Sequence, residues 1–279
     1  MVYSAQSLIF DLFQLYFIFM NNSSSAPDIA PQQTTLQLPK KVFFYGPNGG
    51  GKGTQAKLLT DFGYRHIEMS KLLESHANDV VDITDKKTQK VMKMTIGQAM
   101  AQGFFPPDDI INKILQDDLM RDPSEMALID GGGRTVPQAE MAITSLKDAN
   151  LYEDTRAVRL NISREQAVLQ IYMRALLAKN PRPDDLKIDV INRRLEKYFK
   201  ETLPATELFI PDNKLILVDG TTQVDLEKTV DILKEMRSKY EDVCLESIFA
   251  QEHPDIVATQ RSSIGIVHRK IMHDLQQSV

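Results

Sequence analysis

The chain is poor in cysteine and in net charge, and each scarcity excludes a class of protein. A single cysteine among 279 residues, Cys244, excludes an internal disulfide framework and suits a reducing compartment, so we expect a cytoplasmic location. The formal net charge of −5 provides no general basic field, so we expect no nucleic-acid partner. Three histidines, His253, His268 and His273, lie near the C-terminus without a metal-ligand spacing, and we expect them to be solvated.

The sequence also lacks a long uninterrupted hydrophobic run. Residues 8–20 are apolar, but Asp11 and Gln14 interrupt them, and no Lys or Arg precedes them, so they match neither a membrane span nor a typical signal or mitochondrial presequence. We therefore expect no membrane contact. A membrane anchor, an unusual leader and translation from Met20 are the alternatives. Residues 21–39 are polar and contain three prolines, so residues 1–39 are predicted to be an apolar segment followed by a disordered linker.

The remaining sequence has the composition of an ordinary globular protein, with 42% hydrophobic and 25% charged residues in the whole chain. Short apolar runs, which predict buried strands, alternate with stretches of helical spacing. The predicted strands lie at residues 41–45, 126–130, 157–161 and 214–218, with a further short strand at His66-Ile67-Glu68. Such alternation predicts an α/β fold, with a parallel five-stranded sheet flanked by helices and ligands bound outside the carboxyl ends of the strands.

The strongest local signal is a glycine-rich loop directly after the first predicted strand. Residues 42–54 read Val-Phe-Phe-Tyr-Gly-Pro-Asn-Gly-Gly-Gly-Lys-Gly-Thr, and the spacing from Gly46 to Gly51-Lys52 is that of a phosphate-binding P-loop. Glycines let backbone N–H groups point at phosphate oxygens, and Lys52 would reach the β- and γ-phosphates. The predicted ATP-binding residues are Gly46, Asn48, Gly49, Gly50, Gly51, Lys52, Gly53 and Thr54.

Two candidate ligands for Mg²⁺ follow the ends of predicted strands. Thr54 supplies a hydroxyl in the first helical turn after the loop, although Gly53 occupies the usual place of that hydroxyl. Asp130 ends the apolar run 126–130, as expected for a carboxylate that holds Mg²⁺ through water. The carboxyl ends of parallel strands share one edge of a sheet, so we expect both residues at that edge.

Two motifs resemble adenylate kinase and its nucleoside monophosphate kinase relatives. Residues 49–56 read Gly-Gly-Gly-Lys-Gly-Thr-Gln-Ala, which is similar to the phosphate loop of that family. Residues 130–139 read Asp-Gly-Gly-Gly-Arg-Thr-Val-Pro-Gln-Ala, which resembles the family segment Asp-Gly-Phe-Pro-Arg-Thr-x-x-Gln-Ala. By this resemblance Arg134 grips the phosphate of the acceptor and Gln138 reads the adenine edge.

Weaker matches extend the resemblance over roughly residues 41–240. Residues 182–185 and 193–198 are similar to the family pattern whose arginines clamp the transferring phosphoryl group, and Arg174 resembles the arginine that stacks on the ATP base. Counting forward from Arg182 matches the second arginine of the pattern to Arg193, whereas counting back from Leu195 matches it to Arg194, so both remain alternatives. The implied catalytic residues are Lys52, Arg134, Arg174, Arg182, Arg193 and Arg194, and the implied acceptor-binding residues are Met69, Phe105, Arg134 and Gln138.

The resemblance also implies a domain plan and a cofactor. A kinase-like domain at residues 40–240 would contain an acceptor-binding segment at 69–105 and a short lid at 175–185. Residues 241–279 lie beyond the resemblance, and their apolar residues predict a helical tail. The short lid leaves no room for zinc, so Mg²⁺ with ATP as co-substrate is the expected cofactor. ATP and a nucleoside monophosphate are the expected partners, with a monomer as the default.

The acceptor site departs from the family pattern. Met69 stands where the family has a base-binding threonine, Glu74 replaces an arginine that holds the acceptor phosphate, and Gly132 and Gly133 replace a stiffer Phe-Pro. Losing the arginine and adding a carboxylate would weaken AMP binding by on the order of a hundredfold unless another cation, such as Lys71, compensates. Two functions follow: a working kinase (ATP + AMP = 2 ADP, or a related monophosphate), or a catalytically impaired nucleotide-binding module acting in an assembly.

Overall fold

The computed structural model describes residues 37–279 except 86–87, 103, 105 and 241–242. The predictions for the apolar segment, for the linker as far as residue 36 and for Phe105 therefore lie outside the described residues. Within the described part of the chain, no helix is both long and apolar enough to cross a membrane.

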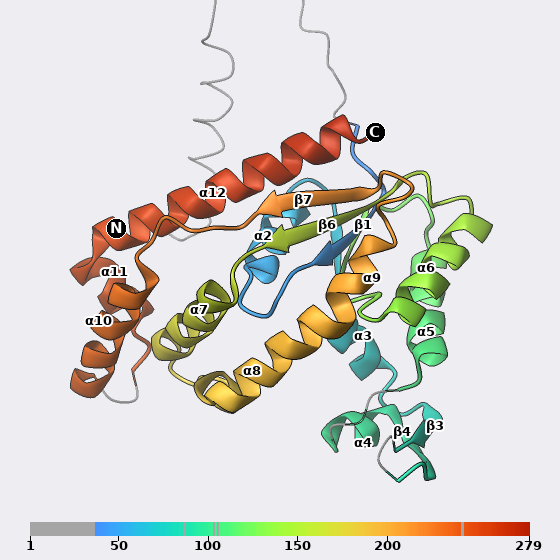
Figure 1. Cartoon of the computed structure of the whole chain (residues 1–279), viewed down its shortest axis with the longest axis horizontal. Coiled ribbons are helices and arrows are strands. Elements are labelled where there is room, and N and C mark those ends of the chain that lie inside the picture. Colours follow the sequence, from blue (N-terminus) through green and yellow to red (C-terminus); the bar gives the residue numbers. More distant parts are fainter. Residues whose placement is uncertain (1–36, 86–87, 103, 105, 241–242) are drawn as a thin grey trace, which may run out of the picture. The chain divides into compact units, whose positions relative to one another are not determined.

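A parallel five-stranded sheet forms the centre of the fold (Figure 1). Its strands are β1 (Lys41–Tyr45), β2 (Arg65–Glu68), β5 (Ala127–Asp130), β6 (Thr155–Asn161) and β7 (Leu215–Asp219). They lie in the order β2-β5-β1-β6-β7, and each neighbouring pair is parallel. The α/β fold class predicted from the alternating apolar runs is confirmed, because each of the five predicted runs overlaps one of these strands.

Helices cover both faces of this sheet. They are α2 (Lys52–Thr60), α3 (Met69–Ser75), α4 (Ile96–Ala101), α5 (Asp108–Met120), α6 (Val136–Asp148), α7 (Arg164–Leu177), α8 (Ile188–Lys197), α9 (Leu203–Glu207), α10 (Leu226–Lys239), α11 (Glu246–Glu252) and α12 (Pro254–Gln277), with the short turns η1 (Pro183–Leu186) and η2 (Tyr198–Thr202). Capping side chains and acidic residues fix where several of these helices begin. Side-chain oxygens of Thr135, Ser163 and Asp225 cap α6, α7 and α10, and Asp108 and Asp109 place negative charge in the first turn of α5.

The stretch from residue 79 to 90, which is mostly polar, contains a strand that was not among the predicted strands. Here β3 (Val80–Thr84) pairs antiparallel with β4 (Val91–Thr95). Val81 and Ile83 are buried, whereas Val80 and Asp82 are exposed. This is the period-2 alternation of a half-buried strand, which the charged residues between the two strands obscured.

The core lies on both faces of β1. Phe43 and Tyr45 stack with a ring-centroid distance of 6.3 Å and pack against Phe209 on one face. Val42 and Phe44 face the opposite side, where Ile271 and Leu275 of α12 complete the apolar cluster. Figure 1 shows α12 running alongside β7. The residues from 246 onward therefore add helices that pack on the preceding part of the fold.

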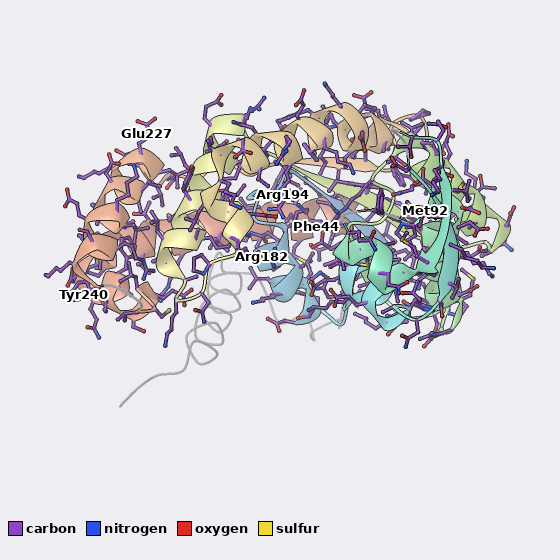
Figure 2. The ribbon with its side chains drawn as sticks, turned by 90° about the horizontal axis from the view of Figure 1, so that it is seen from below. Phe44, Met92, Arg182, Arg194, Glu227 and Tyr240 are labelled. Atoms are coloured by element: carbon purple, nitrogen blue, oxygen red, sulfur yellow. The ribbon has the colours of Figure 1, made fainter. Side chains whose placement is uncertain are left out.

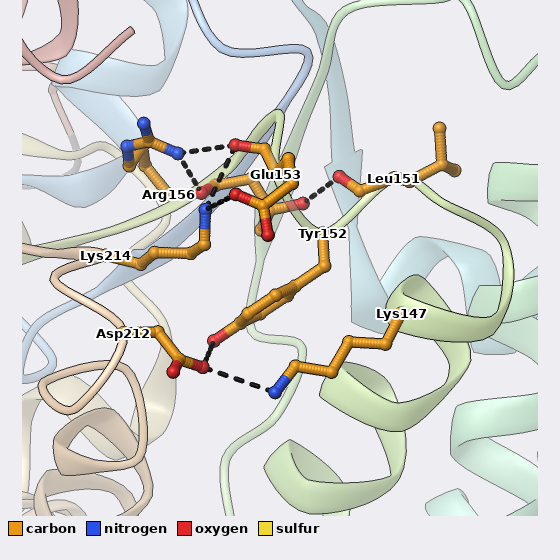
Figure 3. A network of polar contacts seen from close by, with 8 residues as sticks. Lys147, Leu151, Tyr152, Glu153, Arg156, Asp212 and Lys214 are labelled. Atoms are coloured by element: carbon orange, nitrogen blue, oxygen red, sulfur yellow. Dashed lines mark hydrogen bonds and ion pairs between the residues drawn. The ribbon is translucent and has the colours of Figure 1, made fainter.

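A polar network ties together the loops that lead into β6 and β7 (Figure 3). The Tyr152 hydroxyl donates to Asp212 Oδ2 at 2.9 Å, and the ammonium groups of Lys147 and Lys214 lie 4.6 and 5.0 Å from the centroid of the Tyr152 ring. Lys214 Nζ also donates to the carbonyl and carboxylate oxygens of Glu153. The network fixes the end of the sheet opposite to the phosphate loop, because it precedes both strands.

His268 contradicts the expectation of a solvated surface histidine. Its Nδ1 lies 3.2 Å from Gln55 Oε1 on α2, its ring packs on Phe62, and its Nε2 is buried without a hydrogen-bond partner among the described residues. The pKa of His268 is lowered to about 4, chiefly by burial; the Asp61 carboxylate opposes this shift and the Arg269 charge adds to it. The imidazole is therefore neutral in the folded protein at neutral pH.

We expect acid to destabilise the docking of α12. The pKa of His268 in the fold, about 4, lies below its ordinary value, so the unfolded chain binds the extra proton first, and stability falls as the pH drops from about 6.5 towards 4. The full effect is on the order of 2–3 kcal/mol. Urea unfolding at pH 7 and pH 4.5 should show a smaller loss in His268→Gln than in the wild type. His273→Gln, an exposed neighbour on the same helix, is the control. Equal losses in all three proteins would contradict the assignment.

Candidate active site

The glycine-rich loop between β1 and α2 has the geometry of an anion cradle. Gly51 adopts a left-handed conformation (φ 82°) and begins α2, so that the N–H groups of Gly51, Lys52 and Gly53 have no acceptor among the described residues. Such unsatisfied N–H groups and the positive end of the helix dipole favour phosphate oxygens. Gly46, Asn48, Gly50 and Thr54 belong to the same continuous turn, with Asn48 and Thr54 exposed.

Gly49 shows why this loop cannot carry larger side chains. Its φ is +80°, and a β-carbon at this position would lie 2.5 Å from the carbonyl oxygen of Ala167 and 2.9 Å from the side chain of Ile171. Both residues belong to α7, so the loop rests directly on this helix. The close approach requires glycine on steric and conformational grounds.

The ammonium group of Lys52 lies over the loop. Its Nζ donates to the carbonyl oxygens of Gly46 at 2.8 Å and Pro47 at 3.1 Å. The pKa of Lys52 is lowered to about 8, chiefly by burial; the Asp130 carboxylate opposes this shift, and the guanidinium groups of Arg134 and Arg174 contribute to it. These four charges therefore act on one another across the carboxyl ends of β1 and β5.

Asp130, at the end of β5, is ionised. Burial alone would raise its pKa, but the His66 imidazole and the charges of Lys52 and Arg134 outweigh burial and hold the pKa below its ordinary value. His66 Nε2 lies 3.7 Å from Asp130 Oδ2, which is beyond hydrogen-bond distance. An ionised carboxylate and the exposed Thr54 hydroxyl are oxygen donors of the kind that Mg²⁺ prefers, so the residues present fit this ion.

Arg134 follows three glycines that pack tightly. Its guanidinium lies against Gly131 (φ 87°), where an added β-carbon would collide with it. At Gly133 (φ 62°), a β-carbon would lie 2.7 Å from the hydroxyl of Tyr45. That hydroxyl is buried without a hydrogen-bond partner among the described residues. The Tyr45 ring thus supports the loop at the place where the family has Phe-Pro.

A buried carboxylate joins two of the predicted catalytic arginines. Asp185 is 2% exposed and accepts from Arg174 Nη2 at 2.7 Å and from Arg194 Nη1 at 3.3 Å. Arg193 instead points outward, with 72% of its side chain exposed and Asp189 at 3.6 Å. The structure therefore places Arg194 beside Arg174, and Arg193 away from it. Arg182 is exposed at the start of η1 (Figure 2), and its carbonyl accepts from the N–H of Asp185.

The predicted acceptor-binding residues do not all face an open site. Met69 is 4% exposed and packs in the core. The Gln138 side chain is also buried: its Nε2 donates to Asp108 Oδ1 at 2.7 Å and its Oε1 accepts from the N–H of Arg134 at 2.9 Å. Gln138 therefore supports the loop that carries Arg134.

Lys71, the cation considered as a substitute for the missing arginine, pairs with a carboxylate of its own segment. Lys71 Nζ lies 2.5 Å from Glu68 Oε1, and Glu74 is exposed one turn later. Lys71 thus has a different partner, within its own segment. Phe105 lies outside the described residues.

Sequence reasoning missed four residues that the fold brings to this region. His66 lies next to Asp130, Asp108 holds Gln138, and Tyr45 supports Gly133. Gln170, on α7 between Gln166 and Arg174, keeps its Oε1 buried without a partner among the described residues. Asp108 carried a helix-start signal, and Gln170 stood four residues before Arg174. The other two gave no local signal, since their roles depend on neighbouring strands.

Comparisons with known proteins agree with this geometry. No protein-family model matches the chain. The chain is 29% identical over 212 residues to an adenylate kinase of a Thermoanaerobacter species, covering 66% of this chain and 93% of the relative. It is 28% identical over 190 residues to the adenylate kinase of Agrobacterium fabrum (66% and 92%) and 28% identical over 223 residues to that of Petrotoga mobilis (70% and 95%). With its P-loop and its parallel sheet, the chain is therefore adenylate kinase-like, and these relatives indicate a phosphotransferase.

Proposed function

We propose that this protein is an ATP-dependent nucleoside monophosphate kinase that transfers the γ-phosphoryl group of ATP to AMP or to a related monophosphate. The observation that carries the proposal is the geometry of the phosphate loop, where the N–H groups of Gly51 to Gly53 have no acceptor among the described residues and Lys52 Nζ lies over the loop. The charges of Asp130, Arg134 and Arg174 all act on Lys52. Arg194 joins this group through Asp185. Curated relatives named adenylate kinase support the same reaction class.

In this proposal the residues act by position and charge. Backbone N–H groups at Gly51 to Gly53 and the ammonium of Lys52 hold the donor phosphates, and Arg134 holds the acceptor phosphate. Arg174, Arg182 and Arg194 neutralise the charge that spreads over the transferring group. Thr54 and, through water, Asp130 would hold Mg²⁺, which supplies additional positive charge to the phosphate oxygens when bound. No general base is needed, because the acceptor is already a phosphate anion.

The structure supports the identity of the acceptor less strongly than it supports the binding of the donor phosphates. Met69 offers no polar atom, Glu74 is exposed, and Gln138 must leave Asp108 before its amide can read a base. We therefore propose AMP as the first acceptor to test, with other nucleoside monophosphates as variants. The impaired binding module rests only on these departures, whereas Lys52, Asp130, Arg134 and Arg174 support transfer. A cytoplasmic monomer completes the proposal; its basis for location is the single exposed cysteine.

A panel of acceptors tests the proposed reaction. Purified protein with Mg²⁺ and ATP should produce ADP when AMP, dAMP, CMP, UMP or GMP is added singly, with AMP expected to react fastest. Production of ADP is followed in a coupled assay, and reactions without acceptor measure background hydrolysis. ATP binding detected by calorimetry, together with no ADP formation on any of the five, would establish the binding module instead.

A further inference from the structure

The carboxyl end of α7 is capped by residues from much later in the chain. Arg237 on α10 donates from Nη2 to the carbonyl oxygens of Leu176 and Ala178, the latter at 2.9 Å. Its Nη1 donates to the carbonyl oxygen of Val243 at 2.7 Å, and the N–H of Leu245 donates to Leu177 at 2.9 Å. Three consecutive carbonyl groups at the end of α7 are therefore bound from outside the helix.

This arrangement satisfies groups that a helix leaves unpaired. The last carbonyl groups of a helix have no partner within it, and they carry the negative end of its dipole. A planar guanidinium offers several N–H donors in fixed directions, so Arg237 can bind three carbonyl oxygens at once. Leu233, Met236, Leu245 and Phe249 add an apolar contact with Met173 beside this cap. The cap therefore joins α7, α10 and the start of the tail.

The capped helix end is also where the predicted lid begins. After Leu177 the backbone leaves the helix at Ala178, whose conformation is extended (φ −72°, ψ 142°). Arg174 lies in the last turn before this point, acts on the charge of Lys52, and pairs with Asp185 on the far side of the lid. A shift of the α7 end would therefore move Arg174 and the first residues of the lid together.

We propose that Arg237 is a positioning residue for the lid: with residues 243–245 it fixes the hinge at 176–178, so that Arg174 and the lid meet the donor phosphates in one geometry. This inference rests on the proposed function, because it assigns the lid to a donor nucleotide. It assigns a role in phosphoryl transfer to residues 243–245, which lie outside the kinase-like motifs. A purely structural contact would stabilise the fold without affecting nucleotide chemistry.

Three variants of α10 separate these readings. Arg237→Gln removes the guanidinium, Arg237→Lys keeps one charge without the fork, and Lys234→Gln is the control, since Lys234 pairs with Asp231 on an exposed face of the same helix. We expect Arg237→Gln to raise KM for ATP and lower kcat by about tenfold each, because small displacements of catalytic groups are costly. Hydrolysis of ATP relative to transfer should rise, since a loosened lid admits water. Arg237→Lys should fall between Arg237→Gln and the wild type, and Lys234→Gln should match the wild type.

Hydrogen exchange provides a readout that does not depend on turnover. In Arg237→Gln, amides at 178–185 should exchange at least about tenfold faster, both alone and with ATP, while those of α12 keep their wild-type rates. A lower Tm with unchanged KM, unchanged hydrolysis fraction and unchanged exchange at 178–185 would overturn the inference. If the wild type transfers to no acceptor, the proposed function fails, and ATP affinity with lid exchange still decides the role of Arg237.

Discussion

Replacing Lys52 with methionine is expected to lower phosphoryl transfer by about 10²–10³-fold, the loss typical of removing one preorganised charge from a transition-state site. The fold should survive this change. Among the described residues, Lys52 Nζ donates to the carbonyl oxygens of Gly46 and Pro47 alone, and its removal relieves repulsion with Arg134 and Arg174. Steady-state kinetics with saturating Mg²⁺ and ATP measures the loss, and thermal unfolding checks the fold.

A matched control and a second readout sharpen this test. Lys57→Met changes an exposed lysine on the same helix and should retain wild-type activity. The free Lys52 has a pKa of about 8, and a bound triphosphate should raise it. ATP binding at pH 8 should therefore take up about half a proton in the wild type, and none through this group in Lys52→Met. Calorimetry in two buffers of different ionisation enthalpy measures the uptake. Equal uptake in both proteins would place the triphosphate elsewhere.

Replacing Asp185 with leucine is expected to be the most damaging change outside the phosphate loop. The carboxylate is 2% exposed and holds Arg174 and Arg194 together, so its loss leaves two guanidinium groups that repel each other. Because these arginines are 53% and 36% exposed, water screens part of the penalty, and we expect a stability loss of about 1–3 kcal/mol. Activity should fall by about a hundredfold, since Arg174 loses its carboxylate partner and Arg194 keeps only its pair with Asp184 at 3.3 Å.

Asp189→Leu is the matched control for Asp185→Leu. Asp189 also pairs with an arginine, Arg193, but both side chains are more than 70% exposed at a separation of 3.6 Å. The control should change stability by less than about 0.5 kcal/mol and leave kcat unchanged. Asp185→Asn, which keeps one acceptor oxygen, should fall between the wild type and Asp185→Leu. Similar losses in Asp185→Leu and Asp189→Leu would show that Asp185 has no special role.

The errors made from the sequence have a common physical origin. Val81 and Ile83 form a strand because β4 pairs with them, and His268 is buried because α12 reaches Gln55 on α2. Counting along the chain left Arg193 and Arg194 as equal alternatives. In the structure they lie on different sides of α8, Arg194 beside Asp185 and Arg193 beside the exposed Asp189. Each of these outcomes depends on a partner distant in sequence, so local spacing carried little information about it.

The sequence by itself determined the parallel sheet, the phosphate loop and the phosphotransferase class. Buried strands, glycine-dependent turns and the lysine after them are local requirements, and local requirements leave periodic or fixed-spacing patterns in a chain. Tertiary structure alone decided which arginine joins Asp185, what holds Gln138 and how Arg237 caps α7. These are contacts between elements that lie far apart in the sequence. They depend on how the elements pack against one another, which leaves no local pattern in the chain.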